Sequence, residues 1–92
     1  MITTIKRTRA FKRDNKRAAK SFGLENVEKL LADVLVLLTQ EDALPAKYRD
    51  HALYGEWVGC RDCHIRPDLI LIYEITEDVL TLHRVGSHSE LF

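Results

Sequence analysis

The sequence is poor in the features that mark several common classes of protein. Two cysteines allow at most one disulfide, which excludes a disulfide-stapled scaffold. No run of about 18 apolar residues occurs, which excludes an ordinary transmembrane helix. The first residues are charged and lack the apolar centre of a signal peptide. We therefore expect a cytoplasmic protein with reduced thiols and no membrane partner.

Glycine and proline are also scarce, with four and two copies in 92 residues. No linker, internal repeat or low-complexity segment divides the chain. A chain of this length can bury one core without disulfide or metal staples. The length therefore predicts a single domain over residues 1–92.

The sequence has no net charge overall, but its charged residues are unevenly distributed along the chain. The formal charge at pH 7 is zero, yet residues 1–20 hold eight of the 14 lysines and arginines and one of the 14 acidic residues. Such asymmetry favours an anionic partner for the basic end, although a solvated helix face gives the same pattern.

Hydrophobic spacing predicts two helices that follow a first strand. Residues 2–8 are rich in threonine and isoleucine, which favours a short strand. Residues 9–22 and 25–39 repeat apolar side chains at helical spacing. After a loop with Pro45 and Gly55, strands are predicted over 56–65, 69–75 and 79–85. The order β-α-α-β-β-β predicts an α+β fold, with an antiparallel sheet and two helices packed on one face.

Two tight turns predict the register of the last three strands. Turns centred on Pro67 and Glu77 place His64 opposite Ile70, and Ile70 opposite Arg84, on one face of the sheet. Side chains alternate along a strand, so His83 is expected on the helix side as an ordinary histidine without a functional role. The helix side is predicted to be almost wholly apolar and to carry Ile65, Leu69, Leu71, Tyr73, Ile75, Val79 and Val85.

The string from Cys60 to His64 reads C-x-x-C-H, the form that attaches a c-type haem. In a strand its two cysteines would point to opposite faces about 10 Å apart. They could then neither chelate one metal nor form a local disulfide. No second pair of cysteines or histidines completes a zinc site. We expect no metal and no cofactor, and only His64 of this string to matter chemically.

Polar side chains are predicted to converge at the end of the sheet that holds His64. Asp68 lies in the adjoining turn, the last strand returns Arg84 and His88 to the same end, and His51 lies in the entering loop. Imidazoles can act as base and acid near neutral pH, and arginine can stabilise charge on a phosphoryl oxygen. The set fits metal-free RNA cleavage, in which a 2′-hydroxyl attacks its own phosphate. The residue types alone leave open which group is the base and which is the acid. They also leave open a non-catalytic interpretation, because a surface histidine often has no functional role.

Two stretches carry an ordered string of motifs: LPAKYRDHALYGEWVGCRDCHIRPDLILIYEI and LHRVGSHSELF. They contain, in order, Arg-Asp-His, Leu-x-Gly-x-Trp-x-Gly, Arg-Asp-x-His, Pro-Asp, Leu-Ile-Tyr, Arg-x-Gly-x-His and a final Leu-Phe. On these motifs the chain resembles the YafQ-type toxins of the RelE/ParE superfamily. These are ribosome-dependent mRNA endonucleases of bacterial toxin–antitoxin pairs.

The resemblance implies the same β-α-α-β-β-β fold and a set of residue roles. Leu69 stands where members often have tryptophan, so Phe92, the family's C-terminal aromatic, is the side chain expected to stack on a base. The implied catalytic residues are His51, His64, Asp68, Arg84 and His88, with Arg84 stabilising the phosphate.

The resemblance also gives the basic end a purpose. Lys12, Arg13 and Lys16 of the first helix would contact ribosomal RNA phosphates, or be covered by an acidic, DinJ- or RelB-like antitoxin. The expected function is a type II toxin that cleaves ribosome-bound mRNA. One alternative is a toxin of the same fold that binds a partner such as gyrase without cleaving RNA, and another is a haem or metal protein.

Overall fold

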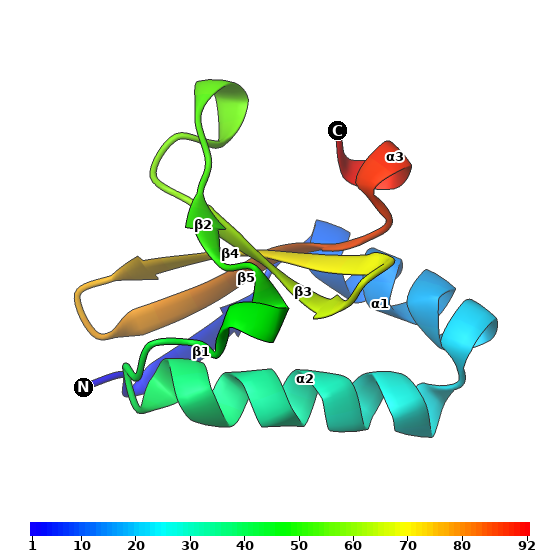
Figure 1. The fold of residues 1–92 in the computed structure, drawn as a ribbon, viewed down its shortest axis with the longest axis horizontal. Helices are drawn as coiled ribbons and strands as arrows, with labels where there is room; N and C mark the ends of the chain where they lie inside the picture. The colour runs from blue at the N-terminus through cyan, green and yellow to red at the C-terminus, as the bar shows by residue number, and fades with distance from the viewer.

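The computed structural model describes residues 1–92 and follows the predicted order of the main elements (Figure 1). The α+β class and the packing of two long helices on one face of a sheet are confirmed. None of the helices combines the length and apolar character that crossing a membrane requires. The elements are β1 (Thr4–Arg7), α1 (Arg9–Phe22), α2 (Leu24–Thr39), β2 (His51–Ala52), β3 (Arg61–Arg66), β4 (Leu69–Thr76), β5 (Val79–Gly86) and α3 (His88–Leu91), with 3₁₀ turns at Ala46–Tyr48 and Gly55–Trp57.

The sheet is mixed, which corrects the prediction of a wholly antiparallel sheet. Its strand order is β1-β5-β4-β3-β2, and β1 runs parallel to β5 with Thr4 opposite Val79. The pairs joined by hairpins, β3–β4 and β4–β5, are antiparallel as predicted. A tight turn imposes an antiparallel pairing only on consecutive strands, and no such turn joins β1 to β5.

The two long helices begin and end at residues with the appropriate capping chemistry. The Thr8 side chain accepts a hydrogen bond from the Phe11 amide at 3.0 Å, which satisfies a free donor at the start of α1. Gly23 adopts a φ of +88°, a conformation that glycine tolerates, and separates α1 from α2. Gly23 is therefore the C-terminal cap that its position suggests.

Two hydrophobic clusters lie on opposite faces of the sheet. Helices α1 and α2 cover one face, whereas α3 and the segment around β2 rise from the other (Figure 1). The main core joins the helices to Cys63, Ile65, Leu69, Leu71, Tyr73, Leu80, Leu82 and Val85. The smaller cluster contains Cys60, Ile70, Ile72 and Leu91, with Leu53 and Trp57 packed against it. The two cysteines of the C-x-x-C-H string thus lie on opposite faces, as predicted, and both are free thiols.

The second hairpin departs from the predicted register. His64 does lie opposite Ile70, but Ile70 lies opposite Gly86 instead of Arg84. The turn holds two residues, with Glu77 at a φ of +56°, and β5 contributes an extra residue at a bulge near His83. A shift of one residue exchanges the two faces of a strand.

The shifted register changes which residues of β4 and β5 reach the helices. Leu80 and Leu82 fill the core, while Ile75 is 39% exposed and Val79 lies outside the core. His83 contacts Trp57, which belongs to the smaller cluster, so the prediction that it faces the helices is wrong.

Three short features were not predicted at their observed places. The strand expected from residue 56 begins at Arg61, because Gly55–Trp57 forms a 3₁₀ turn. Strand β2 has two residues and α3 has four, too few for a hydrophobic period to reveal. Helix α3 nevertheless has a readable signal: Ser87 and Glu90 form a capping box.

Candidate active site

Three of the predicted catalytic residues meet in one cavity of about 200 Å³. His51, His64 and His88 come from β2, β3 and the start of α3, and the C-terminal Phe92 lines the same space. The cavity lies on the face opposite α1 and α2, beside the smaller hydrophobic cluster that contains Ile70. The lining residues are His51, Leu53, Asp62, His64, Ile70, His88 and Phe92.

Strand pairing places His51 and His64 on the cavity. His51 lies directly opposite Asp62 in the antiparallel β2–β3 pair, so these two side chains share a face. His64 is two residues after Asp62 and therefore points the same way. The short strand β2 fixes His51, whose position could not be assigned from the hairpin registers.

Helix α3 carries His88 and Phe92 over the end of the sheet. Its capping box pairs the Ser87 amide with Glu90 Oε1 at 2.8 Å and sets the helix start immediately before His88. Leu91 is buried in the smaller cluster and anchors the helix. A Cβ atom at Gly86 would lie 3.0 Å from Glu90 Oε1, so glycine permits this close approach. The centroids of the His88 and Phe92 rings, which both line the cavity, are 5.1 Å apart.

Backbone carbonyls determine the tautomers of two histidines. His51 Nδ1 lies 2.9 Å from the Arg49 carbonyl oxygen, and His64 Nδ1 lies 3.3 Å from that of Pro67. A carbonyl oxygen only accepts, so each Nδ1 carries a hydrogen in these contacts. In the neutral ring the lone pair is then on Nε2, the atom needed for taking a proton.

Asp62 is a charged residue of the cavity that was not among the predicted site residues. It is only 3% exposed, and its Oδ1 lies 3.1 Å from His51 Nδ1. This Oδ1 has no hydrogen-bond partner, because the Nδ1 hydrogen points at the Arg49 carbonyl. Burial raises the pKa of Asp62, and the nearby His51 and His64 oppose that shift. The sequence did hold a signal for Asp62: it lies two residues before His64, and residues two apart in a strand point to the same face.

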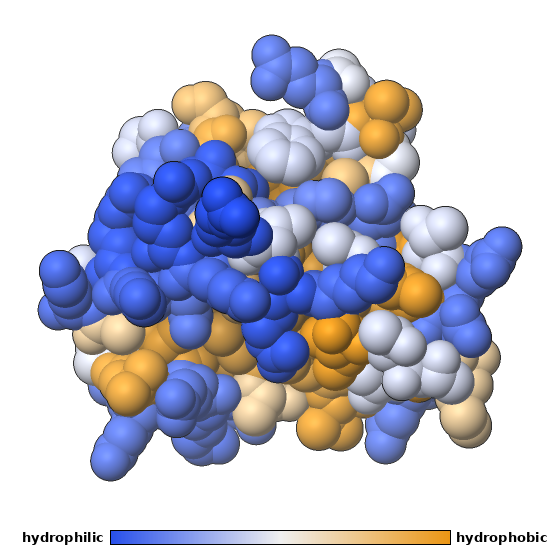
Figure 2. Space-filling model, turned by 180° about the vertical axis from the view of Figure 1, so that it is seen from behind, coloured by the Kyte–Doolittle hydropathy of each residue, from blue (hydrophilic) through white to orange (hydrophobic).

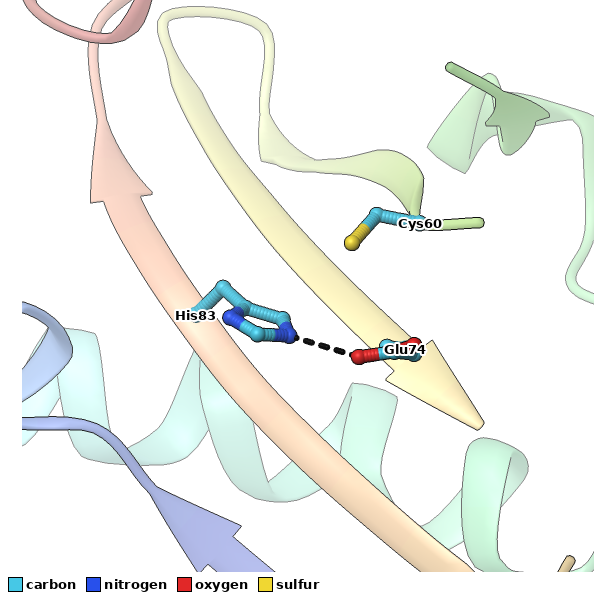
Figure 3. A group of neighbouring side chains, drawn as sticks. All are labelled: Cys60, Glu74 and His83. Atoms are coloured by element: carbon cyan, nitrogen blue, oxygen red, sulfur yellow. Dashed lines mark hydrogen bonds and ion pairs between the residues drawn. The ribbon is translucent and has the colours of Figure 1, made fainter. Parts of the chain in front are cut away.

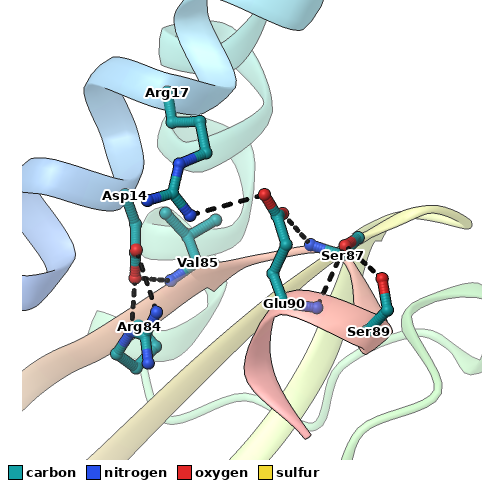
Figure 4. Close-up of polar contacts among 7 residues, drawn as sticks. All are labelled: Asp14, Arg17, Arg84, Val85, Ser87, Ser89 and Glu90. Carbon is teal, nitrogen blue, oxygen red and sulfur yellow. Dashed lines mark hydrogen bonds and ion pairs between the residues drawn. The ribbon is translucent and has the colours of Figure 1, made fainter.

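Arg84 does not line the cavity but is bound to helix α1 (Figure 4). Its Nε and Nη2 donate to the carboxylate of Asp14, with the Nη2 bond at 3.0 Å, and the Val85 amide donates to the same group at 3.3 Å. The hydrogen bond to Asp14 raises the pKa of Arg84. Asp14 is 2% exposed. It is the only acidic residue among residues 1–20, which was the available signal for a buried ion pair.

Asp68 also lies outside the histidine cavity. Its side chain is 59% exposed and forms an ion pair with Arg66 at 3.0 Å. It lines a neighbouring cavity between α1 and α3, together with Arg17, Ser87 and other residues. The neighbouring Leu69 is 2% exposed and fills the core, so it presents no surface for a base to stack on. Phe92, at 50% exposure, does present one.

The basic residues predicted to contact RNA lie on the outer surface of α1. Lys12, Arg13 and Lys16 are all exposed. Figure 2 shows strongly hydrophilic side chains gathered over α1 when the molecule is seen from behind. Lys12 and Lys16 also line a groove of about 560 Å³ between α1 and α2. Helix α1 is joined to α3 by the Arg17–Glu90 ion pair at 3.4 Å, so a basic helix borders the element that carries His88.

A family model described as a bacterial toxin of type II toxin-antitoxin system, YafQ, matches residues 3–92. The chain belongs to the YafQ family. The mRNA interferase toxin YafQ of Escherichia coli strain K12 is 40% identical over 82 residues, which are 89% of this chain and 87% of the relative. The family and the fold implied by the sequence motifs are therefore confirmed.

Two solved structures of related toxins align with the whole of this chain. The E. coli DinJ-YafQ complex matches with a TM-score of 0.84, 38% identity and 99% of its own chain covered. A copper-bound mutant toxin from Helicobacter pylori matches with a TM-score of 0.86, 36% identity and full coverage of both chains. In the first of these a YafQ toxin is bound to DinJ, and in the second a related toxin holds copper.

Proposed function

We propose that this YafQ-family toxin is an endoribonuclease, an mRNA interferase that cleaves ribosome-bound messages by metal-independent acid–base catalysis. The observation that carries the proposal is the meeting of three histidines, a buried carboxylate and an exposed aromatic ring in one cavity. The activity in the name of the E. coli relative supports the same reaction.

The geometry favours His51 as the general base. Its Nε2 would take the proton of the 2′-hydroxyl, and the oxygen would then attack the adjacent phosphorus. The new positive charge on the imidazolium would be stabilised by the Asp62 carboxylate, 3.1 Å from Nδ1. A buried carboxylate acts strongly here because little water screens it.

His88 is proposed as the general acid and His64 as a donor to the phosphate. His88 is the first residue of α3 and lines the cavity, where a leaving 5′-oxygen could receive its proton. His64, which also lines the cavity, would donate a hydrogen bond to a phosphate oxygen. The 2′-oxygen forms the new bond and the 5′-oxygen leaves, so the products are a 2′,3′-cyclic phosphate and a 5′-hydroxyl.

Residues outside the cavity are proposed to position the RNA. Phe92 would stack on a base next to the cut, a contact worth about 1–3 kcal/mol. Arg84 and Asp68 would act on RNA that extends beyond the cavity, since neither lines it. Arg84 keeps its charge for this purpose while bound to Asp14.

The proposed partners are the ribosome with its mRNA and an antitoxin of the DinJ type. Lys12, Arg13 and Lys16 offer an exposed cationic surface to ribosomal RNA phosphates, and such contacts weaken as salt rises. The antitoxin is supported by the complex that the E. coli YafQ forms with DinJ.

A cleavage assay with three arms tests the proposal. Purified toxin is mixed with an mRNA that is free, bound in a stalled ribosome, or bound in the presence of a chelator that spares ribosome integrity. We expect cuts, mapped by primer extension, only on the ribosome and equally with chelator. The copper-bound H. pylori relative makes the chelator arm necessary. Cleavage abolished by chelation would overturn the metal-independent mechanism, and no cleavage in any arm would favour a toxin that acts by binding alone.

Replacing Asp62 by asparagine is expected to stabilise the fold while slowing cleavage. Because burial raises the pKa of Asp62, the folded chain holds this proton more tightly than the unfolded chain. The protonated Asp62 carboxyl therefore stabilises the folded chain at low pH. This stabilisation is lost as the pH rises through the pKa of Asp62 in the unfolded chain and then through its higher pKa in the folded chain. At pH 7 Asp62→Asn should therefore raise Tm, and the gain should shrink in acid. Cleavage should fall by about 10-fold to 100-fold, less than the 10²–10⁴-fold that a general base supplies.

The exposed Asp42 provides the matched control. Asp42→Asn removes the same charge from a solvated site and should change neither Tm nor cleavage appreciably. A lower Tm for Asp62→Asn at pH 7 would contradict the assignment of Asp62 as a costly buried charge.

A further inference from the structure

Cys60, Glu74 and His83 form a second cluster on the sheet, outside the histidine cavity (Figure 3). Each offers one ligand atom, and these atoms all lie within 4.8 Å of one another. Figure 3 shows Glu74 and His83 on the neighbouring strands β4 and β5, with Cys60 held over them by the segment before β3. His83 Nε2 and Glu74 Oε1 are already 2.9 Å apart.

The two-residue turn between β4 and β5 brings His83 into this cluster. In the predicted register His83 would face the helices, away from Cys60. The observed turn shifts the pairing by one residue, so Leu82 faces the helices and His83 lies on the same face as Cys60 and the neighbouring Trp57, whose ring lies 6.1 Å from the His83 ring in an edge-on arrangement. Cys60 is 7% exposed, while the side chains of Glu74 and His83 are 36% and 26% exposed. The cluster is thus closed on the thiol side and open to solvent on the other.

The donor set is typical of a zinc site. A thiolate, an imidazole and a carboxylate are all ligands that Zn²⁺ accepts, and soft sulfur disfavours Mg²⁺ and Ca²⁺. Tetrahedral zinc, with bonds of about 2.0–2.3 Å, separates its ligand atoms by roughly 3.3–3.8 Å. The observed separations, from 2.9 Å up to a limit of 4.8 Å, bracket that range, so side-chain rotations suffice to reach it.

We propose that Cys60, Glu74 and His83 bind a zinc ion, with water as the fourth ligand. On binding, the Cys60 thiol releases its proton to solvent, Glu74 binds as a carboxylate and His83 as a neutral imidazole. The ion takes the place of the hydrogen bond between His83 and Glu74. No protein oxidation or reduction accompanies this exchange.

The site would fasten the segment before β3 to the centre of the sheet. Cys60 belongs to the cluster that also packs Leu53, and Leu53 lines the histidine cavity. Bound zinc would therefore stabilise a wall of that cavity without supplying a catalytic group. This separates the inference from the metal-independent cleavage proposed above.

Trp57 provides a direct reporter, because it is the only tryptophan and lies against His83. Adding Zn²⁺ to the purified chain should change Trp57 fluorescence with one equivalent bound. Co²⁺ in the same place should give a thiolate-to-cobalt charge-transfer absorption. Cys60→Ser should abolish that absorption, and His83→Ala should weaken zinc binding, followed by calorimetry, by more than about 100-fold, since loss of an outer-shell partner alone costs 10–100-fold.

Cys63→Ala is the matched control for the thiol, because Cys63 is buried in the main core on the other face. It should keep the absorption and the zinc affinity. If Co²⁺ bound to the unaltered chain without a thiolate-to-cobalt absorption band, the proposal would be wrong. This outcome does not depend on whether the variants fold. So would zinc binding that survives Cys60→Ser and His83→Ala but disappears in His64→Ala, which would place the metal in the histidine cavity.

Discussion

Replacing His51 by alanine is expected to slow cleavage of ribosome-bound mRNA by about 10²–10⁴-fold, the usual contribution of a positioned general base. His51 lines the cavity, and its Nε2 carries the lone pair of the neutral ring because the Arg49 carbonyl holds the hydrogen on Nδ1. Its side chain is 57% exposed, so the loss of packing should be small and the fold should persist. Single-turnover cleavage rates and thermal unfolding of the same preparation would separate catalysis from stability.

The pH profile of cleavage distinguishes the base from the acid. His51→Ala should remove the limb on which the rate rises with pH, since a base acts when deprotonated. His88→Ala should remove the opposite limb, because an acid acts when protonated. The exposed Lys29 of α2 serves as a control, and Lys29→Ala should keep both limbs. If His51→Ala and His88→Ala lost the same limb, the assigned roles would be wrong.

Replacing Asp14 by alanine is expected to lower the free energy of unfolding by about 3 kcal/mol. Removing one partner of a buried ion pair costs about 3–5 kcal/mol, because the other charge is left without compensation. The lower end applies here, since Arg84 is 26% exposed and water can solvate part of its charge. The Val85 amide would lose its bond to Asp14 as well. Such a loss is a large share of the 5–15 kcal/mol typical of a domain.

Chemical denaturation at neutral pH measures this loss, and Asp33→Ala is its control. Asp33 forms an exposed pair with Lys29 on α2, and its removal should cost no more than about 0.5 kcal/mol. The double variant Asp14→Ala with Arg84→Leu should regain part of the stability, since no unpaired buried charge remains. A loss for Asp14→Ala as small as that for Asp33→Ala would show that the pair is structurally unimportant.

The helices and the first hairpin follow from local signals in the sequence. The apolar spacing of α2 and the glycine at residue 23 act within a few residues, and the structure places both helices where they indicate. The turn at Pro67 sets His64 opposite Ile70 by the same short-range logic. The ordered motifs identify the family and single out the three histidines that share the cavity.

The remaining features depend on contacts between distant segments. The register of the β4–β5 hairpin is decided by which faces of the two strands can pack on the helices, and a shift of one residue exchanges those faces. That exchange brings His83 to Cys60 and Glu74. Asp62 comes to lie opposite His51 only when β2 pairs with β3, and Arg84 meets Asp14 across 70 residues of sequence.

The sequence by itself determined the family, the two helices and the identity of the three cavity histidines, because short-range spacing and ordered motifs specify them. The tertiary structure alone decided the charges that surround them. It buried Asp62 beside His51, tied Arg84 to Asp14 and left Asp68 on a neighbouring surface. Burial and ion pairing depend on the whole packed chain, since the desolvation of a charge is set by every segment that covers it.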